Sequence, residues 1–133
     1  MSLLAKLQED MKAAMKSGDK DRLGVIPMNA EGFSHGLLAS VLGHEWGIGV
    51  RHGCFCAQPY VRALLGISED EVQSSVQSLA AGEPVELPGM LRMSLGVYNT
   101  AEEVDLFVEA LRSILAEGPR ARYVMDKGQR DYV

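Results

Sequence analysis

The sequence lacks a long apolar run, an excess of basic residues and enough cysteines for a disulfide framework. No apolar run is long enough to cross a bilayer, and the N-terminus lacks the apolar stretch of a signal peptide. The 133 residues carry a formal net charge of -5, which argues against a basic surface for nucleic acid. Two cysteines one residue apart do not form a disulfide framework. We therefore expect a cytoplasmic protein that binds neither membrane nor nucleic acid.

The residues that are present have the pattern of one small α+β domain. Hydrophobic residues make up 47% of the chain, and its length allows for one core but not two. Apolar spacing predicts strands at residues 24–29, 48–51 and 91–97, and a short strand or a frayed tail at 121–125. The same signals predict helices at residues 2–17, from 35 to between 43 and 47, at 57–65, from 69 and from 101. This order predicts a small mixed or antiparallel sheet covered by helices.

Local signals predict where several of these elements begin and end. Ser2 is suited to cap the first helix and Gly18 to end it. Capping boxes at residues 68–71 and 100–103 open the last two helices. Pro27 indicates an edge strand or a bulge, because proline cannot donate to a sheet. The residues that we expect to face the core from the last two helices are Val72, Val76, Leu79, Val104, Phe107, Val108, Leu111, Ile114 and Leu115.

The most informative motif runs from Gly49 to Pro59 and places an arginine and two thiols in a glycine-punctuated turn before a helix. The guanidinium of Arg51 offers a planar set of donors that suits a carboxylate. Cys56, just ahead of the helix, can be held as a thiolate by the helix N-terminus and a nearby cation. The motif predicts a site that binds an acid and attacks an atom beside it.

These residues also have structural interpretations. Cys56 can be a small buried residue that closes a loop, as free cysteines often are. Arg92 can form a structural ion pair in its strand instead of binding a carboxylate. Cys54, Cys56 and His52 together suggest a metal, but the spacing is not Cys-x-x-Cys and no second ligand pair follows, so we expect no metal site. On helix surfaces or caps we expect the two remaining histidines, His35 and His44.

Five motifs in order resemble the C-terminal small domain of class V pyridoxal-phosphate (PLP) enzymes, the cysteine desulfurase and selenocysteine lyase group. They are Gly24–Ile26, Gly47–Arg51, Gly53–Pro59, Leu91–Ser94, and Tyr98–Thr100 followed by Glu102–Asp105. The resemblance covers residues 23–133. It implies that Cys56 occupies the position of the persulfide-forming nucleophile and that Arg51 and Arg92 hold the substrate carboxylate. It implies no role for Cys54.

The resemblance also implies that the cofactor machinery lies elsewhere. In the family, the large domain provides the Schiff-base lysine, a histidine stacked on the pyridine ring and an aspartate facing its nitrogen. The lysines of this chain lack the serine- or histidine-flanked setting expected of that lysine; they are Lys6, Lys12, Lys16, Lys20 and Lys127. PLP is the electron sink for carbon–sulfur cleavage. We therefore expect no cofactor and no PLP catalysis for this chain alone, with a PLP-binding large domain in trans as one partner.

The N-terminal segment carries a second resemblance. Residues 1–26 resemble the opening of the GatB/YqeY family, mainly through residues 2–16. The two resemblances together predict a helix and linker at residues 1–22 and a class V aminotransferase-like small domain at residues 23–133. The chain would then be chimeric, whether natural or engineered.

The N-terminal helix has an apolar stripe that requires a partner surface. Its members are Leu4, Leu7, Met11, Ala14 and Met15. A class V small domain likewise exposes an apolar face when the large domain is missing. We expect the helix to dock on the sheet or on the helix at residues 104–115, and we expect a homodimer. Two further functions stay open: a structural or interaction module without catalysis, and a GatB/YqeY-related accessory role.

Overall fold

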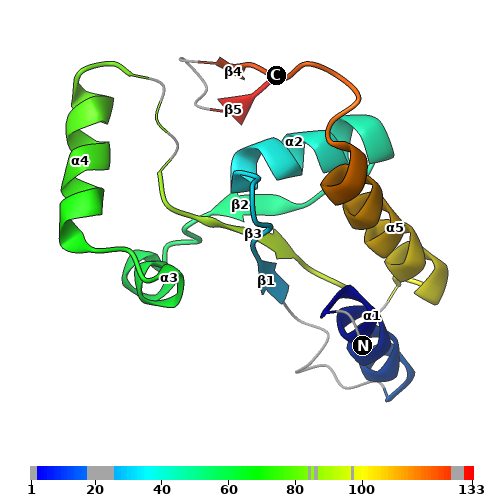
Figure 1. Ribbon diagram of the computed structural model, residues 1–133. Coiled ribbons are helices and arrows are strands. Elements are labelled where there is room, and N and C mark those ends of the chain that lie inside the picture. Colours follow the sequence, from blue (N-terminus) through cyan, green and yellow to red (C-terminus); the bar gives the residue numbers. More distant parts are fainter. Residues whose placement is uncertain (1–2, 18–25, 84, 86, 97, 127–130) are drawn as a thin grey trace.

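The computed structural model describes residues 3–17, 26–83, 85, 87–96, 98–126 and 131–133. Within these ranges the chain forms an α+β fold of five helices and five short strands (Figure 1). The helices are α1 (Leu3–Ser17), α2 (His35–Trp46), α3 (Gln58–Leu65), α4 (Glu69–Ala80) and α5 (Ala101–Glu117). The strands are β1 (Ile26–Met28), β2 (Arg51–Gly53), β3 (Met90–Met93), β4 (Met125–Asp126) and β5 (Asp131–Tyr132). No helix in the described ranges is both long and apolar enough to cross a membrane.

Strand β3 is the centre of a three-stranded sheet with the order β1-β3-β2, and both of its pairings are antiparallel. Pro27 in β1 lies opposite Arg92 in β3, and Arg51 in β2 lies opposite the same arginine. Strand β1 is an edge strand, as Pro27 predicts. A proline is tolerated there because no ladder hydrogen bond is lost on the outer side of the strand. Strands β4 and β5 form a separate antiparallel pair.

The core lies where β3 meets α2 and α5. Leu91 and Met93 are buried, whereas Arg92 between them is not, as the two-residue period of a strand requires. The other members of this buried cluster are Met11, Leu38, Val41, Leu42, Val104, Phe107, Val108, Ala110, Leu111 and Ile114. Full burial of a large apolar side chain contributes about 1.5–3 kcal/mol relative to exposure. Most of the predicted core face of the last helix is thereby confirmed.

Side-chain caps set the starts of α2, α4 and α5. Ser34 accepts a hydrogen bond from the backbone N–H of Leu37 and begins α2. The hydroxyls of Ser68 and Thr100 each accept one from the backbone of a glutamate three residues later. The carboxylate of that glutamate in turn accepts one from the backbone N–H of the capping residue. Both predicted capping boxes are confirmed.

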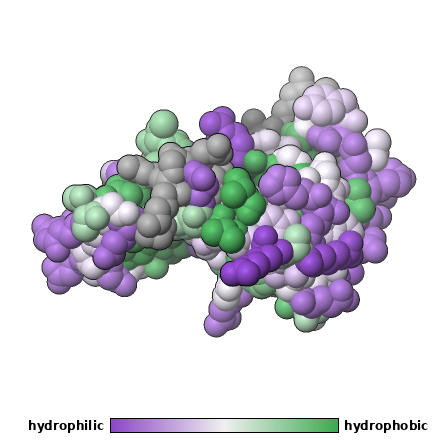
Figure 2. Space-filling view, turned by 90° about the horizontal axis from the view of Figure 1, so that it is seen from above, coloured by the Kyte–Doolittle hydropathy of each residue, from purple (hydrophilic) through white to green (hydrophobic). Residues whose placement is uncertain are grey.

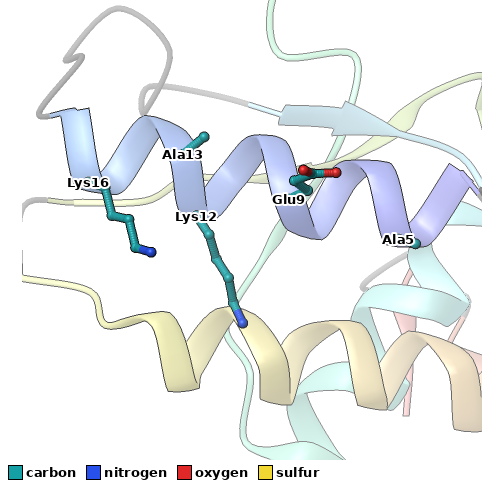
Figure 3. A pocket seen from close by; sticks show the side chains of 5 residues that line it. All are labelled: Ala5, Glu9, Lys12, Ala13 and Lys16. Carbon is teal, nitrogen blue, oxygen red and sulfur yellow. The ribbon is translucent and has the colours of Figure 1, made fainter.

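Helix α1 packs against α5. Met11 is only 3% exposed and belongs to the core cluster. The ammonium of Lys12 lies 2.6 Å from a carboxylate oxygen of Asp105, and Figure 3 shows this lysine reaching from α1 toward α5. It borders a hollow of about 410 Å³ that is lined by Ala5, Glu9, Lys12, Ala13 and Lys16. The helix therefore docks on α5, one of the two predicted surfaces.

Several expectations fall outside the described residues. They concern the predicted helix ends Ser2 and Gly18, the first strand residues Gly24 and Val25, and the side chains of Leu4, Leu7, Ala14 and Met15.

The second strand begins three residues later than the sequence predicts, at Arg51 instead of residue 48. Gly47 has a left-handed backbone with φ 66° and ends α2. The N–H of Ile48 then donates to the carbonyl of Leu42 at 2.9 Å. This helix-ending turn uses the backbone donor that Ile48 would need for pairing with β3, so the strand starts beyond it.

The strand predicted at residues 91–97 is also shorter than expected and ends at Met93. The chain turns soon afterwards, where the side-chain oxygen of Asn99 accepts a hydrogen bond from the N–H of Gly96 at 2.7 Å. In the C-terminal tail, β4 starts at Met125, where the predicted strand was to end. Before β4, the backbone N–H groups of Arg120 and Ala121 donate to Glu45 of α2 and not to a neighbouring strand.

Helices α3 and α4 form an arm that extends away from the body, as Figures 1 and 2 show. Val72 is buried near the start of α4, and Leu79 is half-buried. Val76, one turn after Val72, is 52% exposed, so the expectation that it faces the core is wrong. The arm leads away from the sheet and leaves no core for Val76 to enter. Leu115, on the outer side of α5, is 41% exposed and was also wrongly assigned to the core.

The carboxylate of Glu45 is one of the groups that hold the C-terminal tail to α2. One oxygen of Glu45 accepts hydrogen bonds from the backbone N–H groups of Arg120 (2.9 Å) and Ala121 (3.0 Å). The same oxygen accepts a third bond from the hydroxyl of Tyr123 at 3.2 Å. Burial, and then the charge of Glu45, raise the pKa of Tyr123. The Tyr123 ring stacks on His44, which is exposed on the helix surface as predicted.

Candidate functional site

The thiol loop, residues 53–57, is a tight turn between β2 and α3. The N–H of Ala57 donates to the carbonyl of Cys54 at 2.8 Å. Phe55 and Cys56 between them have positive φ angles of 53° and 60°. Such angles cost non-glycine residues about 1–3 kcal/mol each, so surrounding contacts must hold the turn. The turn leaves Cys56 exposed and Cys54 half-buried, so the interpretation of Cys56 as a buried residue is wrong.

The thiol loop leads directly into α3. Ala57 is the N-cap of this helix, and it makes no capping hydrogen bond through its side chain. Pro59 lies in the first turn, where its fixed φ suits a helix start. Cys56 is therefore two residues ahead of the helix, which is the arrangement that the motif predicts.

Arg51 and Arg92 are direct cross-strand partners on β2 and β3. Side chains at such positions project from the same face of the sheet, with Cα atoms about 4.5–5.5 Å apart. Like charges placed in this way repel and destabilise the sheet. No described residue forms an ion pair with Arg92, which leaves the structural ion pair without support in these ranges. The structure thus brings together the two arginines that the resemblance assigns to a carboxylate.

The guanidinium of Arg92 also contacts the thiol loop. Its central carbon lies 4.9 Å from the centroid of the Phe55 ring, within the range of a cation–π contact. Its Nε is buried and, among the described residues, has no hydrogen-bond acceptor. A buried donor without an acceptor costs about 1–3 kcal/mol, so this nitrogen favours the approach of an acceptor from outside. Arg92 therefore links the arginine pair to the residue between the two cysteines.

A second polar contact lies on the other side of the thiol loop. The Nδ1 atoms of His35 and His52 are 3.2 Å apart, and their ring centroids are 5.3 Å apart. The Nε2 of His35 donates to the carbonyl of Leu87 at 2.9 Å. The two rings border a cavity of about 200 Å³, whose lining also includes Gly53, Cys54, Gln58, Val85, Leu87 and Pro88. His35 lies at the start of α2, directly after its N-cap Ser34, and it is half-buried against His52.

Sequence reasoning missed this histidine contact and the role of Phe55. One available signal was Gly89, which is buried beside the cavity. A Cβ atom at this position would lie 2.5 Å from His35 Nε2 and 2.7 Å from Gly53 Cα. A glycine next to Pro88 can thus be read as a close approach of two backbones. Within the described ranges, no three His, Cys, Asp or Glu side chains are grouped so as to hold a metal ion.

Comparison with known proteins identifies the family. Residues 2–107 match the family model of class-V aminotransferases, and the chain therefore belongs to that family. A cysteine desulfurase of Escherichia coli O127:H6 is 34% identical over 97 residues, which are 73% of this chain and 18% of that protein. A cysteine desulfurase of Yersinia pseudotuberculosis is 30% identical over 111 residues, 84% of this chain and 22% of the relative. A probable cysteine desulfurase of Treponema pallidum is 29% identical over 114 residues, which are 85% of this chain and 23% of that protein.

The chain spans about a fifth of the length of these curated relatives. The family match begins at residue 2 and therefore includes α1. The GatB/YqeY resemblance of residues 1–26, the boundary near residue 22 and a chimeric origin remain predictions.

Proposed function

We propose that this chain is the small-domain part of a cysteine desulfurase-like protein, in which Arg51 and Arg92 bind the substrate carboxylate and Cys56 takes up sulfur. One observation supports this most. Arg92 is the cross-strand partner of Arg51, and its guanidinium lies over the ring of Phe55, the residue between the two cysteines in the sequence. A carboxylate between the guanidinium groups would offset their repulsion and give Arg92 Nε an acceptor. The bound acid would then lie beside the thiol loop.

The described residues do not fit PLP on their own. The described lysines, Lys6, Lys12 and Lys16, all lie on α1, and Lys12 is paired with Asp105. Figure 1 shows α1 beside β1 and α5, whereas the thiol loop leads into α3 at the other edge of the sheet. PLP supplies an electron sink for carbon–sulfur cleavage. We propose that this chemistry comes from a PLP-binding part of the protein, in the same longer chain or in trans.

Carboxylate binding can be measured with L-alanine, which has the backbone of cysteine without its thiol. Titration into ¹⁵N-arginine-labelled protein should shift the Nε–H signal of Arg92. In Arg51→Gln and Arg92→Gln the dissociation constant should rise about tenfold, because each removes a charge-assisted hydrogen bond. Arg112→Gln, at an exposed position of α5, is the matched control and should bind like the wild type. Binding that is absent, or equally weakened by Arg112→Gln, would refute the arginine assignment.

Sulfur uptake can be tested without PLP by adding cysteine persulfide. The Cys56 thiol would take the outer sulfur, giving Cys56–S–SH and releasing free cysteine. Peptide mass spectrometry should find the added sulfur on Cys56 in the wild type and in Cys54→Ser, but on neither position in Cys56→Ser. Uptake mainly by Cys54, or by neither thiol, would contradict the proposed role of Cys56.

A second candidate function is an interaction module. The α3–α4 arm exposes Tyr60, Leu64 and Val76, which are large apolar side chains. Such a surface favours association, with the predicted homodimer or a PLP-binding large domain as partner. Sedimentation of wild type and of Leu64→Glu/Val76→Glu tests the homodimer. A dimer that the double variant dissociates would support it, and a wild-type monomer at all concentrations would contradict it.

A further inference from the structure

His35 and His52, here called the imidazole pair, join three segments of the chain beside the thiol loop. His35 is the first residue of α2, and His52 is the middle residue of β2. Leu87 lies in the segment that leads into β3. His35 contacts both of the others, with its Nδ1 at 3.2 Å from His52 Nδ1 and its Nε2 at 2.9 Å from the Leu87 carbonyl.

These contacts determine where the hydrogens of the pair lie. A carbonyl oxygen can only accept, so Nε2 of His35 carries a hydrogen. In neutral His35 the Nδ1 atom then has only a lone pair, and His52 must donate from its own Nδ1. One added proton on Nε2 of His52 leaves this contact in place. A second added proton puts hydrogens on both facing Nδ1 atoms, and the contact is then lost.

The imidazole pair is well placed to position the thiol loop. His52 directly precedes Gly53, the first residue of the loop, and Cys54 lines the same cavity as both rings. Gly89 packs so closely on His35 and Gly53 that the segment before β3 and the start of the loop lie against each other. The contact of Phe55 with Arg92 holds the middle of the loop. Two consecutive positive φ angles need such support from both sides.

We propose that the imidazole pair positions the thiol loop so that Cys56 faces solvent while Cys54 faces the cavity, and that double protonation of the pair releases the loop. The importance of this positioning for sulfur uptake rests on the proposed function; the positioning itself does not. The ionisable group that the thiol loop adds to the cavity is Cys54, while α3 adds the neutral amide of Gln58. By sequence, Glu86 stands between the lining residues Val85 and Leu87.

The test compares two substitutions of His52. His52→Asn keeps an N–H donor near the position of Nδ1 but cannot take up a proton, whereas His52→Leu removes the donor. The readout is the ratio of the reaction rates of Cys56 and Cys54 with dithiodipyridine, which reacts with thiols in acid as well as at neutral pH. At neutral pH this ratio should fall about fivefold in His52→Leu, the effect of one hydrogen bond, and stay near the wild-type value in His52→Asn.

The pH profile separates positioning from a general structural role. When the solution is acidified from neutral pH, the wild-type ratio should fall as both imidazoles become protonated, while the ratio in His52→Asn stays constant because asparagine takes up no proton. Glu86→Gln removes the charge of Glu86. The difference between the pH profiles of the wild type and His52→Asn should be the same when both proteins also carry this substitution. Equal profiles for wild type and His52→Asn would overturn the proposal, and so would an unchanged ratio in His52→Leu. If His52→Leu does not fold, the comparison of wild type with His52→Asn decides.

Imidazole ¹⁵N spectra at neutral pH give an independent readout. They should show hydrogen on Nδ1 of His52 and on Nε2 of His35, and the opposite tautomer at His52 would overturn the proposal. Failure of the two proposals can be distinguished, because L-alanine binding depends on the arginines and not on the imidazole pair. A positioned loop in a protein that binds no carboxylate would refute the proposed function alone.

Discussion

The two faces of β3 differ in what they contribute to the protein. On one face, Leu91 and Met93 are buried against the helices and form part of the core. On the other face, Arg92 lies between Pro27 and Arg51, with a buried nitrogen that has no acceptor in the described part of the chain. The first face stabilises the fold, while the second keeps like charges together at a cost. A strand of four residues thus supports both the core and the candidate site.

The largest expected effect comes from breaking the core face. Leu91→Ala should lower the free energy of unfolding by about 2–5 kcal/mol, because Leu91 is fully buried and its removal leaves a cavity. The matched control on the other face, Arg92→Met, should change stability by less than about 1 kcal/mol or raise it, since it removes a repulsive pair. Urea unfolding of the two variants measures both. A larger loss for Arg92→Met would mean that the arginine face is itself a stabilising element.

The next effect concerns the point where the chain enters β3. Gly89→Ala should cost about 1–3 kcal/mol, because the new methyl group would overlap His35 and Gly53 unless the backbone moves. Gly43→Ala, inside α2 with nothing near the added methyl group, should instead stabilise the protein by about 0.5–1 kcal/mol. Thermal unfolding with calorimetry gives both values. If both variants changed the free energy of unfolding in the same direction, the close packing of Gly89 would be contradicted.

A smaller effect tests the strain of the thiol loop. A residue with a Cβ atom costs about 1–2 kcal/mol in a left-handed backbone, and glycine avoids this cost. Glycine also loses more backbone entropy on folding, which lowers the stability by about 0.5–1 kcal/mol. Cys56→Gly should therefore be more stable than Cys56→Ala by about 0.5–1 kcal/mol. At Ala57, where φ is −121°, glycine has no such advantage, so Ala57→Gly should destabilise. Chemical unfolding of the three variants checks this, and a less stable Cys56→Gly would contradict the backbone geometry.

The smallest effect is a dependence on acid pH. Hydrogen bonds from the Asn99 side chain and then from the Thr100 backbone lower the pKa of Glu103. A carboxylate whose pKa is lower in the folded state stabilises above its unfolded value, and this stability is lost as pH falls through the folded value. Glu103→Gln should therefore flatten the fall in melting temperature below about pH 5. Glu109→Gln, at an exposed position of the same helix, should leave that slope as in the wild type.

The sequence predicted those parts of the fold whose causes are local. Ser34, Ser68 and Thr100 are followed within a few residues by the groups that they bond, so the helix starts could be read directly. The inward face of α5 also follows from its own spacing. The start of β2 was missed because the turn that ends α2 uses the N–H of Ile48. Val76 has the spacing of a core residue, but the sequence does not indicate that α4 leads away from the sheet.

The candidate site was predictable in its residues but not in its arrangement. Arg51, Cys56 and Arg92 could be named from motifs, whereas the opposition of the two arginines depends on the register of β2 against β3. Gly89 indicates only that two backbones approach closely, and the contact between His35 and His52 itself depends on how α2 lies against the sheet. Contacts between distant segments follow from packing, which local patterns do not specify.

The attachment of the C-terminal tail gives this protein a built-in optical probe. Trp46 is the only tryptophan, and the guanidinium of Arg120 lies 4.9 Å from its ring. Because the backbone of Arg120 is held by Glu45, detachment of the tail would change the surroundings of the indole even while the core stays intact. Tryptophan emission would then follow the tail, and circular dichroism would follow the helices. The two melting curves coincide only if the C-terminal end unfolds cooperatively with the rest of the chain.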